Sequence, residues 1–277
     1  MCRFTLYLGP TIRLSSLVVA ALVVAGCDDE PKGPLQVRQN ALVWEGVVPA
    51  GQTVTIRDFA GDIEVRPSAD DTVRVVARLE WRGGDPDKSL HLSGATVPSG
   101  ALICAVWGEG KCTVEDYSAK LDLGGNDAKV FFTVDVPAGV RLDLQNISGD
   151  IVAAATAPVQ ASTMNGDIRV VTAVGPVQGE TLNGSVDIRM SSLANTDSIF
   201  AKTLNGNAFI YLPSLDDAVL DIGVANGSAS SAFAPAGVKT EPKKITGRIG
   251  AGTRVVHAFS INGEVALRKL GADGTAP

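Results

Sequence analysis

The sequence is poor in aromatic side chains and has no excess of positive charge. Aromatic residues make up 5% of its 277 residues, whereas glycine contributes 30, so the core must be built mainly from small aliphatic side chains. Asp and Glu outnumber Lys and Arg by 30 to 24. Nucleic acids and anionic lipid surfaces are bound through basic faces. This charge balance therefore argues against nucleic acid as a partner.

Histidine is also scarce, which limits metal and triad chemistry. The two histidines, His91 and His257, form no ligand set of zinc spacing with Cys104 and Cys112. Neither histidine belongs to a nucleophile motif such as Gly-x-Ser-x-Gly. The Gly-Gly-x-Gly-x-Asp repeat of calcium-binding β-rolls is absent. We therefore expect no catalytic residue, no metal and no cofactor.

The apolar run at residues 17–25 is too short to span a bilayer and is typical of a signal peptide. Arg3 and Arg13 precede the run, and the segment before it contains no acidic residue. The run ends in Val-Ala-Gly-Cys27, which resembles a bacterial lipobox. That resemblance implies cleavage before Cys27 and acylation of its sulfur and amino group, so the lipid bilayer becomes a partner through Cys27. The alternative is an ordinary secretory signal followed by an incidental cysteine.

Export also sets the state of the remaining cysteines. Cys2 leaves with the signal peptide, so Cys104 and Cys112 are predicted to form a disulfide that closes a local hairpin in an oxidising compartment. Trp107 lies between them and is the candidate contact residue of this loop. The signal peptide takes two of the 24 basic residues and no acidic residue with it, leaving 22 against 30. The mature chain therefore has a net charge near −8.

A short motif recurs along the chain, with a glycine preceded in most copies by Asn. We expect a structural turn at each of these glycines, because Asn-Gly pairs tolerate left-handed backbone angles. Apolar residues stand two positions before the glycine and two and four positions after it, a period that predicts strands with one buried face. The glycines are Gly61, Gly149, Gly166, Gly184, Gly206, Gly227 and Gly263. The apolar residues two positions before them are Phe59, Ile147, Met164, Leu182, Leu204, Ala225 and Ile261.

The spacing of the motif distinguishes two all-β folds. Successive glycines from Gly149 to Gly227 are 17, 18, 22 and 21 residues apart, and whole motifs recur in phase, with Thr163, Thr181 and Thr203 in one column. Recurrence in phase favours a parallel β-solenoid of short coils with Asn-Gly corners. An antiparallel β-sandwich, with turns at both ends of its strands, is the alternative. One further coil is expected around residues 247–252.

The order of several segments resembles a known family. The series "VTIRDFAGDIEVRPSADDTVRVVARLEW", "VFFTVDVPAGVRLDLQNISGDIVA", the Asn-Gly turns and "GRIGAGTRVVHAFSINGEVALRK" is similar to the bacterial "putative adhesin" domains of unknown function. The resemblance covers roughly residues 42–269. It implies an exported, adhesin-like β-solenoid module, and the family has no established catalytic residues that could be assigned here.

These observations predict the organisation of the chain. Residues 1–26 form a lipoprotein signal peptide, 27–41 the acylated N-terminus and linker, 42–270 the adhesin-like domain with its stapled loop near 104–112, and 271–277 a disordered tail.

We expect a non-enzymatic lipoprotein of the cell envelope that presents a binding surface to a protein or glycan. Its location would be the periplasmic side of the inner membrane or the outer membrane. One alternative is a carbohydrate-active β-helix enzyme, for which Asp62, Asp150 and Asp167 supply a column of acids. A second alternative is a self-assembling envelope scaffold.

Overall fold

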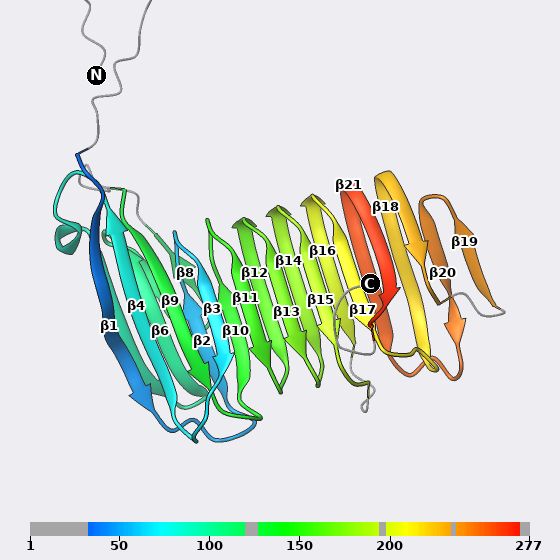
Figure 1. Cartoon of the computed structure of the whole chain (residues 1–277), viewed down its shortest axis with the longest axis horizontal. Coiled ribbons are helices and arrows are strands. Elements are labelled where there is room, and N and C mark those ends of the chain that lie inside the picture. The colour runs from blue at the N-terminus through cyan, green and yellow to red at the C-terminus, as the bar shows by residue number, and fades with distance from the viewer. Residues whose placement is uncertain (1–32, 120–126, 194–197, 234–236, 272–277) are drawn as a thin grey trace, which may run out of the picture.

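The computed structural model describes residues 33–119, 127–193, 198–233 and 237–271 (Figure 1). The predicted signal peptide, Cys27 and residues 272–277 lie outside this range. Within it, the regular structure is almost entirely β, with one short 3-10 helix, η1 (Pro86–Lys88). None of the described residues belongs to a helix of the length and hydropathy needed to span a membrane.

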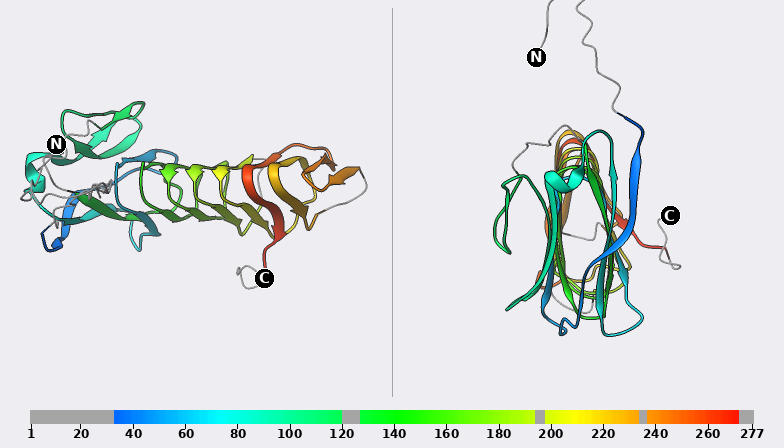
Figure 2. Two further views of the ribbon diagram at one scale, coloured as in Figure 1. Left: turned by 90° about the horizontal axis from the view of Figure 1, so that it is seen from above. Right: turned by 90° about the vertical axis from the view of Figure 1, so that its left-hand side faces the viewer.

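The strands form one mixed, mostly parallel sheet that folds into two long facing rows and nearly closes around the core (Figures 1 and 2). The first row, in order of hydrogen bonding, is β1 (Gln36–Gly46), β4 (Val73–Trp81), β9 (Lys129–Val136), β3 (Ile63–Pro67), β11 (Ile151–Ala155), β13 (Ile168–Thr172), β15 (Val186–Met190), β17 (Ala208–Leu212), the second half of β21 (Val255–Lys269) and the second half of β18 (Ala218–Ser231).

The second row lies opposite the first. Its order is β5 (Leu90–Val97), β6 (Gly100–Trp107), β2 (Thr53–Arg57), β10 (Arg141–Gln145), β12 (Val159–Asn165), β14 (Val177–Asn183), β16 (Ile199–Asn205), the first half of β21, the first half of β18, β20 (Lys244–Ile249) and β19 (Val238–Glu241). A separate two-stranded ribbon is made by β7 (Lys111–Cys112) and β8 (Tyr117–Ser118).

The parallel register predicted from the repeat is confirmed. Ile168 in β13 pairs with Val186 in β15, and Val186 pairs with Ala208 in β17, all in parallel. The three side chains are at most 1% exposed. Within this part of the chain the antiparallel sandwich alternative is therefore wrong, because equivalent positions lie side by side in neighbouring parallel strands.

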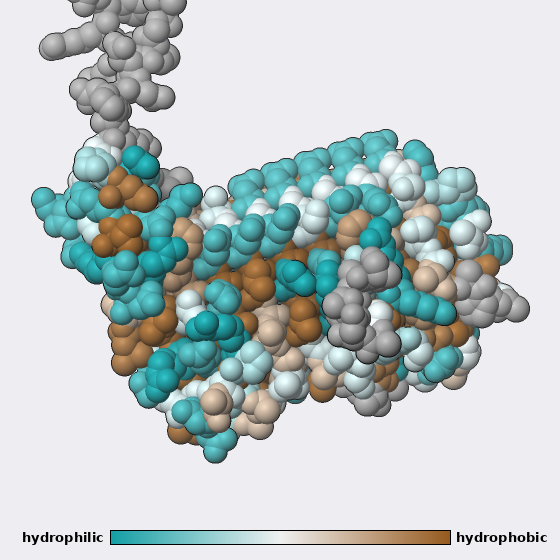
Figure 3. Space-filling model, in the orientation of Figure 1, coloured by the Kyte–Doolittle hydropathy of each residue, from teal (hydrophilic) through white to brown (hydrophobic). Residues whose placement is uncertain are grey.

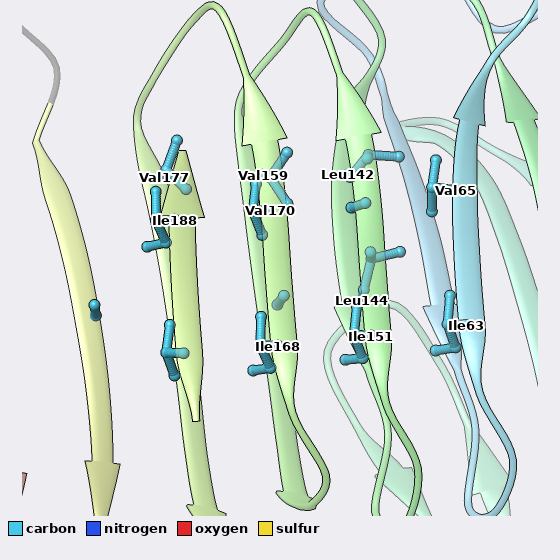
Figure 4. Packing of buried hydrophobic residues seen from close by; sticks show 14 of the residues in the cluster. Ile63, Val65, Leu142, Leu144, Ile151, Val159, Ile168, Val170, Val177 and Ile188 are labelled. Atoms are coloured by element: carbon cyan, nitrogen blue, oxygen red, sulfur yellow. The ribbon is translucent and has the colours of Figure 1, made fainter. Parts of the chain in front are cut away.

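The core is a narrow layer of aliphatic side chains between the two rows. Figure 4 shows the inward side chains of β10, β12 and β14 packed against those of β3, β11, β13 and β15, and the labelled residues are at most 2% exposed. Small aliphatic side chains suit this layer because a narrow interior leaves little volume per residue. The low aromatic content of the sequence thus matches the shape of the core.

One predicted apolar column is wrong. Met164, Leu182 and Leu204, two positions before their glycines, are 45%, 43% and 38% exposed. The inward position belongs instead to the threonine one residue earlier, as at Thr181, which is 4% exposed. The positive-φ glycine of each turn interrupts the alternation of side chains, so the inward positions before and after it do not share one period of two.

The buried threonines join adjacent turns. The Oγ1 of Thr163 donates to the carbonyl of Gly149 (3.3 Å), that of Thr181 to Gly166 (3.0 Å), and that of Thr203 to Gly184 (2.7 Å). A buried hydroxyl is tolerated because each has this partner. The recurrence of threonine in the sequence therefore reflects a structural hydrogen bond that links one turn to the preceding one.

The order of strands in space differs from their order in the chain. Strand β21 lies between β16–β17 and β18, because Asn262 pairs with both Asn205 and Asn226. The last glycine motif, at Gly263, therefore sits between those of Gly206 and Gly227. Gly227 and Gly263 also lie within the continuous strands β18 and β21, although both keep positive φ values of 144° and 155°.

Antiparallel strands close both ends of the molecule. The coil expected around residues 247–252 is wrong, because β20 pairs antiparallel with β18 and β19. At the other end β1 pairs antiparallel with β4, and the Trp44 side chain lies directly against Gly94 of β5. Strand β1 begins at Gln36, ahead of the domain boundary expected at residue 42.

Candidate functional site

The column of acids that follows the glycines caps the turns. The Asp62 Oδ1 accepts the backbone N–H of Asp150 (2.9 Å), the Asp150 Oδ1 that of Asp167 (2.8 Å), and the Asp167 Oδ1 that of Ser185 (2.7 Å). Each acid thus holds the next turn in register. These contacts to backbone amides give the Oδ1 atoms of the three acids a structural role.

The asparagines of the turns form a second column. Their side-chain amides donate successively to the amide oxygen of the neighbouring turn, at 2.7–3.0 Å, through Asn226, Asn262, Asn205, Asn183 and Asn165. The seven predicted turn glycines all have positive φ. On the face seen in Figure 3, rows of hydrophilic side chains follow the long axis and alternate with hydrophobic surface.

The predicted disulfide joins Cys104 of β6 to Cys112 of β7, with 6.2 Å between their Cα atoms. It holds the short β7–β8 ribbon against the second row of strands. The Tyr117 hydroxyl adds a hydrogen bond to the Ala105 carbonyl (2.7 Å). The stapled loop expected near residues 104–112 therefore includes the end of the core strand β6, and the disulfide ties this strand to a hairpin formed by residues 111–118.

Trp107 is a core residue, and its prediction as a contact residue is wrong. Its side chain is fully buried, and its ring lies 5.5 Å from the ring of Phe59, centroid to centroid. Strand β6 continues through Cys104 to Trp107, so the alternation of the strand turns the indole inward. A loop assignment that began at Cys104 hid this alternation.

Neither histidine forms a catalytic site with the acids of the repeat. His91 is exposed on the edge strand β5, and the His257 Nδ1 lies 3.2 Å from the Asp221 Oδ2 at the surface. No group of three or more metal-ligating side chains is found among the residues that the structure describes.

Asp58 is a completely buried carboxyl group next to Phe59. Its burial raises the pKa well above the ordinary value for Asp, and the backbone N–H groups of Phe59 and Ala60 oppose this shift only in part. A raised pKa means that the folded state binds the proton more tightly than the unfolded chain. The contribution of Asp58 to stability is therefore most favourable below the ordinary pKa and is lost as the pH rises through the folded pKa.

Replacing Asp58 by Asn should make the protein less sensitive to alkaline pH. The Tm of the unmodified protein should fall relative to that of Asp58→Asn as the pH rises from the ordinary pKa of Asp through the raised pKa of Asp58, as followed by circular dichroism. The Asp70→Asn variant serves as a control of opposite sign, because the Thr72 amide and the Ser68 hydroxyl lower the pKa of the exposed Asp70. A constant difference in Tm between Asp58→Asn and the unmodified protein would contradict the role of Asp58.

A depression lies beside the disulfide hairpin, and we call it the hairpin groove. Its volume is about 360 Å³, and strands β2, β10, β12, β14 and β16 form its floor. The Thr55 side chain lines it, is 1% exposed, and has an Oγ1 with no hydrogen-bond partner among the described residues. A buried hydroxyl without a partner is uncommon in folded proteins. The remaining lining residues are Thr53, Ser99, Val114, Arg141, Leu142, Asp143, Pro158, Val159, Gln160, Pro176, Val177, Gln178 and Phe200.

Arg57 fixes the wall of the hairpin groove. Its guanidinium makes two hydrogen bonds to the Asp143 carboxylate, at 2.6 and 3.1 Å, and a third to the Val114 carbonyl of the hairpin at 2.8 Å. A bidentate pair holds both side chains in one geometry. The hairpin is therefore attached to the sheet by the disulfide and by Arg57, and Val114 forms a defined wall.

Two further hollows lie on the same row of strands. The threonine hollow, about 320 Å³, is lined by Ser162, Thr163, Glu180, Thr181, Leu182, Lys202, Thr203, Leu204, Phe259 and Ile261. The lysine hollow, about 430 Å³, is lined by Asp221, Gly223, Val224, Ala225, Lys243, Lys244, His257 and Phe259.

Sequence reasoning missed these hollows because their residues come from separate copies of the repeat. Gln160 and Gln178 occupy the same position in successive motifs, and β12 and β14 place them side by side. Nothing in the sequence indicated that the hairpin would form a wall above it.

The chain matches no known family model and no curated protein sequence. Three solved structures are similar over 86% of this chain. A "putative cell adhesion protein" from Clostridium sporogenes matches over 100% of its own length, with 10% identity and a TM-score of 0.39. "Putative adhesins" from Bacteroides fragilis and Parabacteroides distasonis match over 98% and 97% of their lengths, with 11% and 10% identity and TM-scores of 0.36 and 0.25. At these values the matches establish neither family nor function.

Proposed function

We propose that the chain is a non-enzymatic lipoprotein of the bacterial envelope, in which a β-solenoid presents the hairpin groove to a protein or glycan partner. The observation that carries this proposal is the partnerless Thr55 hydroxyl on the floor of a groove that also exposes the amides of Gln160 and Gln178. A ligand with hydroxyl or carbonyl groups would satisfy these donors and acceptors.

The rigidity of the surrounding structure supports a preformed binding surface. The floor of the groove comes from parallel strands, and its hairpin wall is held by a disulfide and by Arg57. A surface that is already ordered loses little conformational entropy when a ligand binds. The solenoid interpretation is supported by the parallel pairing of successive motifs from β10 to β17.

The alternatives receive less support from the described residues. The acids proposed for a β-helix enzyme hold backbone amides of the next turn. Antiparallel strands at both ends interrupt the parallel pairing that end-to-end assembly of solenoids would continue. A binding protein therefore agrees best with the geometry.

The proposed anchor determines which end of the molecule faces the membrane. Eight residues separate Cys27 from Gln36, the start of β1, so the two residues are at most about 30 Å apart. The end with β1 and β4 would therefore stay close to the bilayer, and the β19–β20 hairpin would lie at the far end (Figure 1).

Replacing Cys27 by Ala should abolish lipid attachment. Bacteria that express the full chain and grow with radioactive palmitate should label the unmodified protein and leave Cys27→Ala unlabelled, because the thioether and the new amino terminus both depend on this residue. The Cys2→Ala variant is the matched control, since Cys2 lies in the predicted signal peptide, and it should keep full labelling. Undiminished labelling of Cys27→Ala would remove the lipoprotein assignment.

Binding through the groove can be measured with the mature protein in detergent. We expect a member of a panel of envelope glycans and envelope proteins to bind without being degraded, and the double variant Gln160→Ala/Gln178→Ala to bind it about tenfold more weakly, because two hydrogen bonds are lost. Arg169→Ala, on the opposite row, should bind normally. Degradation of a polysaccharide that Asp150→Asn abolishes would establish an enzyme instead.

A further inference from the structure

The hairpin groove, the threonine hollow and the lysine hollow lie on one row of parallel strands. The first spans β2 to β16, the second β12 to β21, and the third lies over β21, β18 and the start of β20. Neighbouring strands in a sheet are about 4.8 Å apart, so the seven strands from β2 to β18 span about 29 Å. The three hollows therefore follow the long axis and cross the strands.

Aromatic side chains connect the hollows. Phe200 lines the hairpin groove, and its ring lies 6.1 Å from that of His257 in the lysine hollow. Phe259 lines both the threonine hollow and the lysine hollow. Both rings are partly exposed on outward positions of β16 and β21. A long ligand could therefore pass from one hollow to the next over apolar ring surfaces.

The charge of these hollows is opposite to that of the chain. Four cations line them, Arg141, Lys202, Lys243 and Lys244, against three acids, Asp143, Glu180 and Asp221. Arg57 neutralises Asp143, so the region is locally positive while the chain has a net charge of −6. Arg141 has no side-chain partner among the described residues. A local excess of positive charge on an acidic protein favours an anionic ligand.

The uncharged lining residues favour a sugar chain over other anions. The partnerless Thr55 hydroxyl and the Gln160 and Gln178 amides offer hydrogen bonds at aligned outward positions of β2, β12 and β14. The apolar faces of sugar rings can pack on Phe200 and Phe259, which removes apolar surface from water. Amides and apolar rings would add little to the binding of an inorganic anion.

We propose that the three hollows form one track that binds a linear acidic polysaccharide bearing carboxylates, with Arg141 at one end and Lys243 and Lys244 at the other. This inference rests on the proposed binding function and names the ligand class of the same groove. Because the charges lie at both ends, a chain that reaches across the strands contacts both, whereas a short oligomer contacts one.

Dextran and carboxymethyl dextran test the proposal, because they share a backbone and differ in carboxylates. We expect the mature protein in detergent to bind long carboxymethyl dextran at least tenfold more tightly than dextran. Arg141→Gln and Lys243→Gln/Lys244→Gln should each weaken that binding about fivefold or more, and raised salt should weaken it further. Arg169→Gln, which removes an exposed positive charge from β13 on the opposite row, should bind normally.

Dextran sulfate and short carboxymethyl dextran separate the ligand features. One contrary result is tighter binding of dextran sulfate than of carboxymethyl dextran, with Arg169→Gln weakening that binding as much as the variants at Arg141, Lys243 and Lys244 do. That result would indicate general attraction of polyanions and would overturn the proposed track. The proposal would also be overturned if Arg141→Gln and Lys243→Gln/Lys244→Gln each weakened the binding of short carboxymethyl dextran by the same factor as the binding of long carboxymethyl dextran. Binding of neutral glycans or of a protein through Gln160 and Gln178, with no preference for carboxylates, would refute the acidic ligand and leave the proposed function intact. Failure of every panel member to bind would refute both.

Discussion

Replacing Gly149 by alanine is expected to lower the free energy of unfolding by about 3 kcal/mol or more. An alanine Cβ at this position would lie 1.8 Å from the carbonyl oxygen of Gly61 and 2.5 Å from its carbonyl carbon. Both atoms belong to the backbone of the neighbouring turn and cannot move without disturbing its hydrogen bonds. The residue also has a φ of +145°, a backbone angle that residues with a side chain rarely adopt. Steric overlap and backbone strain therefore act together.

Urea unfolding of the purified protein measures this effect, and Gly223→Ala provides the matched control. Gly223 lies in strand β18, where an added Cβ would find its nearest neighbour, a Phe259 ring carbon, at 3.6 Å. That distance is ordinary van der Waals contact, so this variant should unfold within about 1 kcal/mol of the unmodified protein. Equal free energies of unfolding for Gly149→Ala and Gly223→Ala would contradict this prediction. Neighbouring turns would then move apart to accommodate the added Cβ without a loss of stability.

Trp107→Ala is the second substitution with a large expected effect. The side chain is fully buried against Phe59, and its removal should cost about 3–5 kcal/mol of the free energy of unfolding through lost burial and a residual cavity. Chemical denaturation followed by far-ultraviolet circular dichroism checks the loss. The effect should appear with no ligand present, because Trp107 packs inside the protein.

Trp81→Ala is the comparison for Trp107→Ala. Trp81 is only partly buried, and the Arg38 guanidinium lies over its ring at 5.6 Å, so its loss should cost clearly less. Trp107→Phe should recover part of the stability lost in Trp107→Ala, because it restores an apolar ring. Normal stability of Trp107→Ala combined with loss of glycan binding would return Trp107 to the surface and contradict the structure.

Local periodicity predicted the strands well because it depends on residues close in sequence. The in-phase copies between Gly149 and Gly206 correspond to parallel neighbours. It failed at Met164, because the turn interrupts the period of two. It failed again near Gly247, where a similar composition forms an antiparallel hairpin.

The binding surface was much less predictable than the fold. Sequence proximity to the cysteines suggested Trp107, but strand alternation places this side chain in the core. The hairpin groove needs Thr55, Val114 and Gln178 in one place, and these residues are separated by up to 123 positions in the chain. Their meeting depends on long-range pairing and on the Arg57 contact with the hairpin.

The amino-acid sequence by itself determined the β structure, the repeated glycine turns, the aliphatic core and the pair of cysteines that bond, because each depends on local period, backbone freedom or composition. Tertiary structure alone decided that β21 inserts before β18, that antiparallel strands close both ends, and that Thr55 is buried without a partner beside a fixed hairpin. These features depend on which distant segments pair. Several pairings bury similar apolar surface, so local sequence patterns cannot distinguish them.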